Sequence, residues 1–252
     1  MLKVIASALV AALTLGAGNA HAGIITGGSA LLDKAKVEQM GGWLGQDVDL
    51  TKIYAKSAGN TSYDFHKAVD GKGASLVVMQ VTSQSTGATS LIGAYNPQSW
   101  NSTSGYNTSN DSASRSAFLF NLDTNAVFRQ RTDVTTYGYY DYWYDYYYSY
   151  TQDNGLYQTY NYAGYGPTFG NGHDLYVAMD LSYAYSNLYS YASSTSAGLL
   201  GNENYWSNAM TVSSMEVFTF AQARNDVPEP GSLALFAISL IGVAAARRKR
   251  SH

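Results

Sequence analysis

The stretch Ala74-Ser-Leu-Val-Val-Met-Gln-Val81 decides the class of fold. It is a nearly continuous apolar run rich in valine, and it directly follows the turn sequence Asp70-Gly71-Lys72-Gly73. A short β-branched run bounded by turn residues is typical of a buried strand. We therefore predict a buried strand here.

Similar apolar runs lie on the C-terminal side of this stretch and are separated by segments rich in Asn, Ser, Thr and Gly. The runs are Thr89–Tyr95, Ser116–Leu122, Asp174–Leu181 and Ser214–Phe220. Many short strands joined by such turns favour a mainly β (α+β) fold with two antiparallel sheets packed as a β-sandwich.

The N-terminal side of the opening stretch has a helical pattern. Ser29 can cap a helix that has Asp33 in its first turn and is ended or weakened by Gly41-Gly42. Its expected apolar face consists of Leu32, Ala35, Met40 and Trp43. A second short helix is expected over Ser62–Val69, with Asp64 near its start.

Residues 1–22 have the three parts of a secretory signal peptide. Lys3 supplies a positive start, Val4–Ala17 is uncharged and mainly apolar, and Ala20 and Ala22 occupy the small-residue positions of a cleavage site. We predict cleavage before Gly23, which predicts export. The alternative is an uncleaved N-terminal membrane anchor.

The C-terminal segment 227–252 also has three parts. It begins with the helix-breaking sequence Val227-Pro228-Glu229-Pro230-Gly231 and continues with an uncharged stretch over residues 232–246. As a transmembrane helix this stretch would be about 23 Å long, short of the roughly 30 Å hydrocarbon core. The basic cluster Arg247, Arg248, Lys249 and Arg250 would hold its end in the cytoplasm.

This order of parts resembles the PEP-CTERM sorting signal of Gram-negative bacteria. The resemblance implies an exosortase-type membrane processing enzyme as a partner, at least transient anchoring through residues 232–246, and delivery to the cell surface or extracellular matrix. It also implies a host that makes exopolysaccharide. A simple single-pass anchor is the alternative, and the sequence leaves open whether the tail is cut or retained.

Composition excludes several classes of function. Outside residues 1–22 and 228–252 there are 10 Lys/Arg and 17 Asp/Glu, a balance of 10 − 17 = −7. An acidic body disfavours nucleic acid as a partner, because binding to phosphates needs clustered basic residues. With no cysteine in the chain, disulfides, thiol catalysis and cysteine metal sites are excluded.

The body, residues 23–226, resembles the TLDc domain in a series of blocks in the family's order. The blocks are Asp64–Gly73, Ile92–Tyr95, Trp100, Ala117–Leu122, Gly166–Leu175 and Met215–Phe218. The resemblance implies a two-sheet antiparallel β-sandwich flanked by short helices, without established catalytic residues. The residues taken as the family motif are Gly166, Pro167, Phe169, Gly170, Gly172, His173, Asp174 and Glu216.

An insertion over residues 134–165 departs from the family pattern. Of the 23 tyrosines in the chain, 18 lie between Tyr137 and Tyr191, too many for one core. Tyrosine combines a flat apolar face with a polar edge, which suits binding to sugars. The alternatives are a long β-hairpin with cross-strand aromatic pairs and a low-complexity loop. The candidate ligand contacts are Tyr139, Tyr142, Trp143 and Tyr146.

Catalytic motifs are missing from the sequence. After signal cleavage the histidines are His66, His173 and His252, and neither a nucleophile-elbow nor a zinc-protease motif occurs. We therefore predict no catalytic residues, metal or cofactor, and expect a non-enzymatic matrix protein that binds exopolysaccharide. The alternatives are an extracellular hydrolase-like enzyme with a site around His173 and Glu216, and a protective protein whose tyrosines are oxidised.

Overall fold

The computed structural model describes residues 23–103, 105–192, 198–201 and 208–222. The predicted signal helix (1–22) and the apolar stretch 232–246 lie outside these residues. Within the described part of the chain, no helix is long and apolar enough to cross a membrane.

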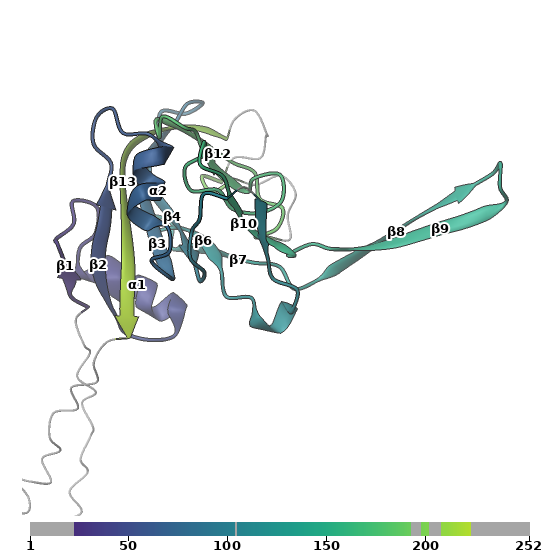
Figure 1. The fold of residues 1–252 in the computed structure, drawn as a ribbon, viewed down its shortest axis with the longest axis horizontal. Helices are drawn as coiled ribbons and strands as arrows, with labels where there is room; N and C mark the ends of the chain where they lie inside the picture. Colours follow the sequence, from purple (N-terminus) through teal and green to yellow (C-terminus); the bar gives the residue numbers. More distant parts are fainter. Residues whose placement is uncertain (1–22, 104, 193–197, 202–207, 223–252) are drawn as a thin grey trace, which may run out of the picture.

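One large sheet organises the fold (Figure 1). β1 and β2 pair in parallel, and the other neighbours pair antiparallel. In spatial order its strands are β1 (Ile25–Thr26), β2 (Val48–Ala55), β13 (Ala209–Gln222), β3 (Ser75–Ser83), β4 (Thr89–Asn96), β6 (Phe118–Asn121) and β7 (Ala126–Arg129).

The opening stretch forms β3, which lies inside this sheet between β13 and β4. Its side chains alternate between two buried clusters. Leu76 and Val78 point into one, while Val77, Met79 and Val81 point into the other. The prediction of a buried strand is confirmed, and burial of both faces explains why the run is apolar at nearly every position.

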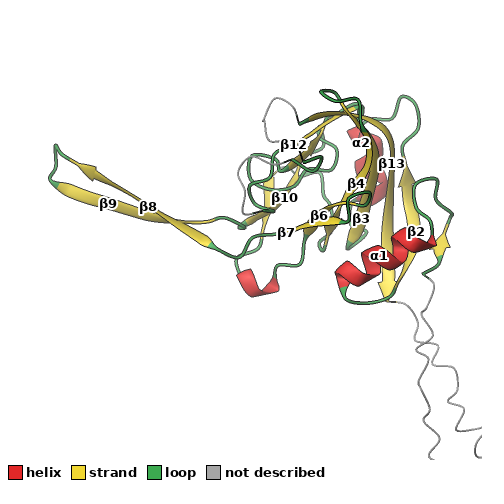
Figure 2. Cartoon of the chain, turned by 180° about the vertical axis from the view of Figure 1, so that it is seen from behind, coloured by secondary structure: helices red, strands yellow, loops and turns green. Residues whose placement is uncertain are grey.

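The two clusters lie on opposite faces of the sheet. The first is covered by α1 (Lys34–Leu44), which Figure 2 shows in front of the strands. The second is covered by α2 (Ser62–Val69) together with the short strands β11 (Leu175–Val177) and β12 (Tyr183–Ser186). β5 (Gly105–Thr108) pairs with β10 (Tyr157–Asn161), and the single-turn helix η1 (Ser112–Ser114) follows β5.

The mainly β prediction is therefore confirmed, with two short α-helices in the described residues. The layers are linked by hydrogen bonds, because the first residues of β13 pair with β12 on one side and with β3 on the other. The 14-residue β13 is thus a shared strand, and it extends well beyond the predicted Ser214–Phe220.

The two helices differ in how well the sequence predicted them. α2 matches its predicted bounds, and Asp64 forms a capping box with Thr61. For α1 the predicted cap was wrong: Asp33 is the N-cap, and the helix continues through Gly41-Gly42 to Gly45. The predicted face was also partly wrong, since Ala35 is exposed.

The predicted strand Asp174–Leu181 is reduced to Leu175–Val177. The chain turns directly afterwards, with the Leu181 N–H donating to the Ala178 carbonyl and Leu181 at a φ of 55°. After this turn the chain reverses and pairs with β11 as β12. The apolar sequence alone does not reveal this reversal.

The insertion forms a long two-stranded hairpin of β8 (Val134–Asp141) and β9 (Tyr146–Asp153). It projects away from the body, while the two ends of the described fold meet at another side of the molecule (Figure 1). Of the alternatives for this segment, the β-hairpin with cross-strand aromatic pairs is the one that forms. The rest of the insertion, from β10 onward, belongs to the body.

Candidate functional site

The tyrosines of the hairpin are sorted by the alternation of the two strands. Tyr137 lies opposite Tyr150, and Tyr139 lies opposite Tyr148. Both pairs are stacked with ring centroids 5.2 Å apart. We call this side of the hairpin the tyrosine face; its rings are Tyr137, Tyr139, Tyr146, Tyr148 and Tyr150, all exposed.

The opposite face of the hairpin carries fewer rings. Tyr140 and Tyr147 lie there as a cross-strand pair, beside Gly138, where a Cβ atom would collide with the Tyr147 ring. A Thr136–Thr151 hydroxyl contact of 3.2 Å continues this face toward the base. Aromatic residues thus gather on one face, which gives the hairpin an aromatic side and a more polar side.

The four predicted ligand contacts are all exposed. Tyr139 and Tyr146 belong to the tyrosine face, and Tyr142 and Trp143 form the turn at the tip. Trp143 is 96% exposed. The same face also contains Tyr137, Tyr148 and Tyr150, which the predicted set leaves out and which the period of two residues in the strands could have found.

Two ionic contacts hold the base of the hairpin. The side chain of Arg115 is fully buried. Its guanidinium donates to Asp153 at 2.5 Å and to the Ser109 and Arg131 carbonyls. This pairing lowers the pKa of Asp153. Before the other strand, Arg131 forms two hydrogen bonds with Asp133. These bonds are the largest cause of the lowered pKa of Asp133, which is about 2. The hairpin is therefore fixed where it joins the body.

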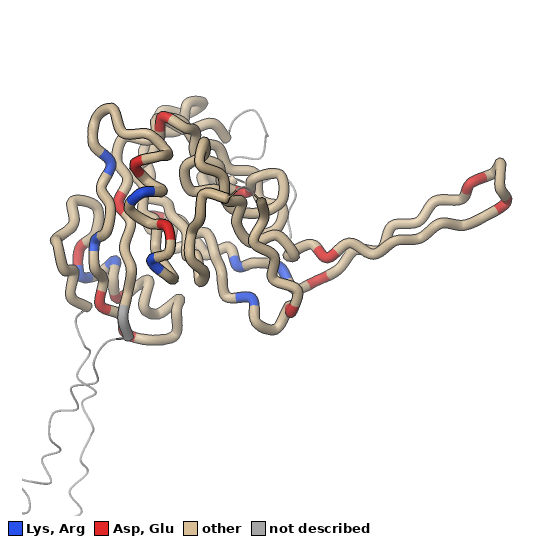
Figure 3. Tube along the Cα trace, viewed as in Figure 1, with Lys and Arg blue, Asp and Glu red and all other residues tan. Residues whose placement is uncertain are grey.

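Charge is distributed unevenly over the hairpin. Figure 3 shows Asp residues at the tip and the base and no basic residue along the strands. The sequence explains this, because no Lys or Arg occurs between Arg131 and Arg224. A ligand of the tyrosine face therefore meets rings and acidic groups, which disfavours polyanions.

Most of the family-motif residues build a tight turn beside the hairpin. Phe169 is fully buried against Trp100, with ring centroids 5.4 Å apart, and Pro167 is also buried. Gly170 has a φ of 76°, and a Cβ there would collide with the Asp174 carboxylate. A Cβ at Gly166 would press on Val177 and Leu181, and Gly172 has a φ of 72°. These glycines serve close packing and left-handed backbone.

Asp174 is the buried centre of this turn. One carboxylate oxygen accepts the backbone N–H groups of Tyr189, Ser190 and Tyr191 at 2.6, 2.6 and 2.9 Å. Burial raises the pKa of Asp174 to about 7, against the opposing effect of these N–H groups. The contacts tie the 187–191 loop to the 170–174 turn, so Asp174 has a positioning role.

The His173 ring lies apart from the Asp174 carboxylate. It stacks on Tyr176 with centroids 5.7 Å apart, and Tyr160 and Tyr165 also contact it. Burial lowers its pKa. His173 has a φ of 68°, in the left-handed region that few residues other than Gly adopt and in which Asn, Asp and His are enriched.

Glu216 does not join His173. Its carboxylate accepts from Ser29 and from the Ala30 N–H, and pairs with Lys52 at 3.4 Å. Burial raises its pKa, but these contacts outweigh burial, so the pKa of Glu216 is lowered. Ser29, the predicted helix cap, instead holds the N-terminal segment against β13.

The core separates these two residues. Met215 and Val217 point into the cluster that also contains Leu175 and Val177, so Glu216 and Tyr176 point away from that cluster in opposite directions. His173 stacks on Tyr176. The hypothesis of a joint site around His173 and Glu216 is therefore corrected: the structure does not bring the two side chains together.

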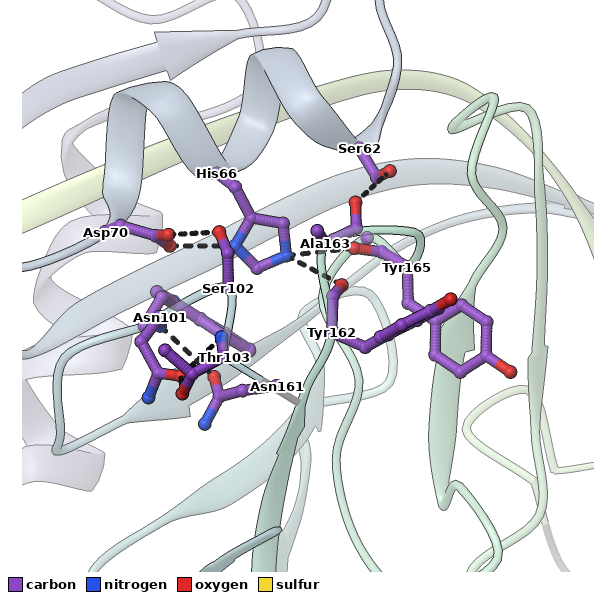
Figure 4. Close-up of polar contacts among 12 residues, drawn as sticks. Ser62, His66, Asp70, Asn101, Ser102, Thr103, Asn161, Tyr162, Ala163 and Tyr165 are labelled. Carbon is purple, nitrogen blue, oxygen red and sulfur yellow. Dashed lines mark hydrogen bonds and ion pairs between the residues drawn. The ribbon is translucent and has the colours of Figure 1, made fainter. Parts of the chain in front are cut away.

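Figure 4 shows a third polar group around His66, Asp70 and Ser102. Asp70 bonds to His66 Nδ1 at 2.7 Å and to the Ser102 hydroxyl at 2.5 Å. His66 Nε2 faces the carbonyls of Tyr162 and Tyr165 at 3.0 and 3.1 Å. Nε2 therefore donates and cannot take a proton from a nucleophile, and the serine is bonded to the acid instead of the base. This order does not form a nucleophilic relay.

The cavities that open on the described surface include the following two. One, of about 520 Å³, is formed by Lys56 to Thr61 together with Asp180, Ser182 and Ser213. Its polar groups largely bond to protein: Lys56 donates to the Val212 carbonyl, and Asp180 accepts from Ser182. The other, of about 250 Å³, lies at the hairpin base. No cluster of three metal-ligating side chains occurs within the described ranges.

Comparison with known proteins identifies the family. The TLDc domain family matches residues 25–221, nearly the whole described body, and the chain belongs to this family. The PEP-CTERM protein-sorting motif matches residues 226–250, which lie outside the described residues. Both resemblances are thus confirmed. The sorting motif implies export, processing by an exosortase and membrane-associated sorting to the cell surface. No curated protein matches the chain.

Proposed function

We propose that this protein is a non-enzymatic surface module that binds the extracellular polysaccharide of its host through the tyrosine face. The observation that carries the proposal is the projecting β8–β9 hairpin, with five exposed rings on one side. Large exposed aromatic patches mark interaction sites in soluble proteins. Sugar rings present C–H faces and hydroxyl edges, which complement the face and the hydroxyl of tyrosine.

The geometry of the hairpin supports a binding role. Cross-strand stacking of Tyr137 on Tyr150 and of Tyr139 on Tyr148 orders the rings before a ligand arrives. Preordered rings lose little conformational entropy on binding. The fixed base, with Arg115 on Asp153, transmits this order to the body.

The position of the hairpin also supports a matrix-facing role. The last described strand ends at Gln222, beside Val48 of β2, and Ile24 donates to Asp49 in the same region. The hairpin leaves the body at a different side (Figure 1). A tail that continues from β13 toward the sorting motif therefore starts away from the tyrosine face, which leaves that face open to the surroundings.

The hydrolase alternative gains no support from the site. His173 packs among tyrosines, Glu216 is occupied by Ser29, Ala30 and Lys52, and His66 donates to backbone carbonyls. Glu216 and His66 are thus engaged in contacts that hold the fold.

The test is a pull-down of the exported protein with purified matrix polysaccharide from its host. Replacing Tyr137, Tyr139, Tyr148 and Tyr150 with Thr keeps β-propensity and removes the rings. We expect at least about a tenfold loss of affinity, equivalent to about 1.4 kcal/mol. Tyr140→Thr with Tyr147→Thr is the matched control on the other face and should retain binding. Equal binding by all three proteins would refute the proposal.

A further inference from the structure

The smaller cavity lies where the hairpin meets the body. It is lined by Gln152 of β9, by Asn171 and Gly172 of the family-motif turn, and by Asn187 and Tyr189 of the following loop. Its volume of about 250 Å³ is slightly below the roughly 300–1,000 Å³ of pockets for drug-sized ligands. It therefore has room for one ring-sized group.

The walls of this cavity are fixed before any ligand binds. The Asp174 carboxylate holds the backbone of Tyr189, and the Asp174 carbonyl accepts from the Asn187 N–H at 3.1 Å. Ser190 Oγ accepts from the Asn171 N–H at 2.9 Å. Asn171 and Asn187, which border the cavity from two loops, are thus positioned by one buried acid and its neighbours.

The side chains that line the cavity are neutral and polar. Within the described residues, the Asn171 and Asn187 amides make no side-chain hydrogen bond, and both residues are half-buried. Each amide offers two donors and one acceptor oxygen, the combination that hydroxyl groups require. The nearest guanidinium, Arg131, lies over the Tyr189 ring and is paired with Asp133. No free positive charge is present here for an anionic ligand.

The cavity is continuous with the tyrosine face. Gln152 lies on the same face of β9 as Tyr150 and Tyr148, because the three alternate at a period of two. Its amide donates to the Tyr189 hydroxyl at 2.6 Å. A chain lying along the rings would thus reach the cavity without crossing another element.

We infer that this cavity is a saccharide subsite that holds one sugar residue of a neutral, hydroxyl-rich polysaccharide, with the rest of the chain on the tyrosine face. The inference rests on the proposed function and narrows its ligand to an uncharged polymer. Asn171 and Asn187 bond the hydroxyls, and Tyr189 supplies the apolar wall. Tyrosine rings give affinity along the strand, and the amides select the ring in the subsite.

Calorimetric titration of the full chain with soluble hexasaccharides tests the inference. The probes are cellohexaose, maltohexaose and mannohexaose as neutral chains, and hexagalacturonate as the charged one. We expect at least one neutral chain to bind, and Asn171→Ala with Asn187→Ala to raise its Kd at least about tenfold. Asn110→Ala, an exposed asparagine elsewhere, is the matched control and should leave Kd within about twofold.

Several outcomes overturn the inference. They are hexagalacturonate binding as tightly as every neutral chain, no neutral chain binding, and an unchanged Kd in the double asparagine variant. If matrix polysaccharide still binds and still depends on the tyrosine face, the subsite alone has failed. If the tyrosine variant also binds the matrix normally, the proposed function has failed as well. Thermal melting shows whether the double asparagine variant is folded. Its melting temperature should not change, because the two amides make no side-chain hydrogen bond in the described structure.

Discussion

The side-chain amide of Gln152 donates a 2.6 Å hydrogen bond to the hydroxyl of Tyr189. Gln152 is near the end of the hairpin strand β9, and Tyr189 is in the loop held by Asp174. This contact therefore joins the projecting hairpin to the loop that the Asp174 carboxylate holds.

The hairpin should be dispensable for folding. Thr136 and Thr151 are directly paired, so an Asn-Gly turn can replace residues 137–150 and close a shorter hairpin. The removed rings contact mainly one another, and we expect the free energy of unfolding to change by less than about 1 kcal/mol. Urea unfolding followed by tryptophan fluorescence measures this. A loss of several kcal/mol would mean that the hairpin is part of the folding unit.

Arg115 should contribute more to the free energy of unfolding than its partner Asp153. Arg115→Met leaves Asp153 and two backbone carbonyls without their donor, and we expect a loss of about 3–5 kcal/mol in unfolding free energy. Asp153→Asn keeps a partial partner for the guanidinium and should cost about 1 kcal/mol. Chemical denaturation of both variants checks the order, and equal effects would contradict it.

Asp174 should make stability depend on pH. Its pKa rises from an ordinary 3.8 to about 7 in the fold, so between these values the native state holds a proton that the unfolded chain has lost. Stability should therefore fall as pH rises through this window. Asp174→Asn removes the titration, and the difference between wild-type and variant unfolding free energies should shift across the window. A difference that stays constant from pH 4 to about pH 8 would contradict this assignment.

Neighbouring glycines in α1 should respond in opposite ways to substitution. A Cβ at Gly42 meets nothing within 4 Å, so Gly42→Ala should stabilise by up to about 1 kcal/mol. A Cβ at Gly41 would lie 2.9 Å from the Gln46 carbonyl oxygen, so Gly41→Ala should lose that gain and destabilise. Thermal melting of the pair measures the contrast, and stabilisation by both would show that the helix end can shift.

His66 should act on stability and not on turnover. His66→Ala removes the donor to the Tyr162 and Tyr165 carbonyls and should cost about 1–3 kcal/mol. Ser102→Ala alters only an exposed hydroxyl and should cost less than about 1 kcal/mol. Unfolding measurements compare the two. A hydrolytic activity abolished equally by both substitutions in folded protein would instead indicate a catalytic group.

Local signals predicted the elements whose formation depends on neighbouring residues. α2 follows from Asp64 capping the helix that starts beside it, and the strands around β3 and β4 follow from apolar runs between turn residues. The predicted cap of α1 was wrong although the Ser29 hydroxyl accepts the N–H groups of Leu31 and Leu32, because the helix begins only at Lys34, where Asp33 accepts the Lys36 N–H. The hairpin was one of the alternatives for the insertion, because a tyrosine-rich sequence is compatible with both a β-hairpin and a loop.

The sequence by itself determined the family, the mainly β class, the export and sorting signals, and the concentration of tyrosine in one segment. These depend on composition and short motifs, which are read along the chain. Tertiary structure alone decided which face carries the rings, that His173 and Glu216 lie apart, and that Gln152, Asn171 and Asn187 border one cavity. Such juxtapositions depend on strand register and on the buried Asp174, where contacts between distant residues outweigh local preference.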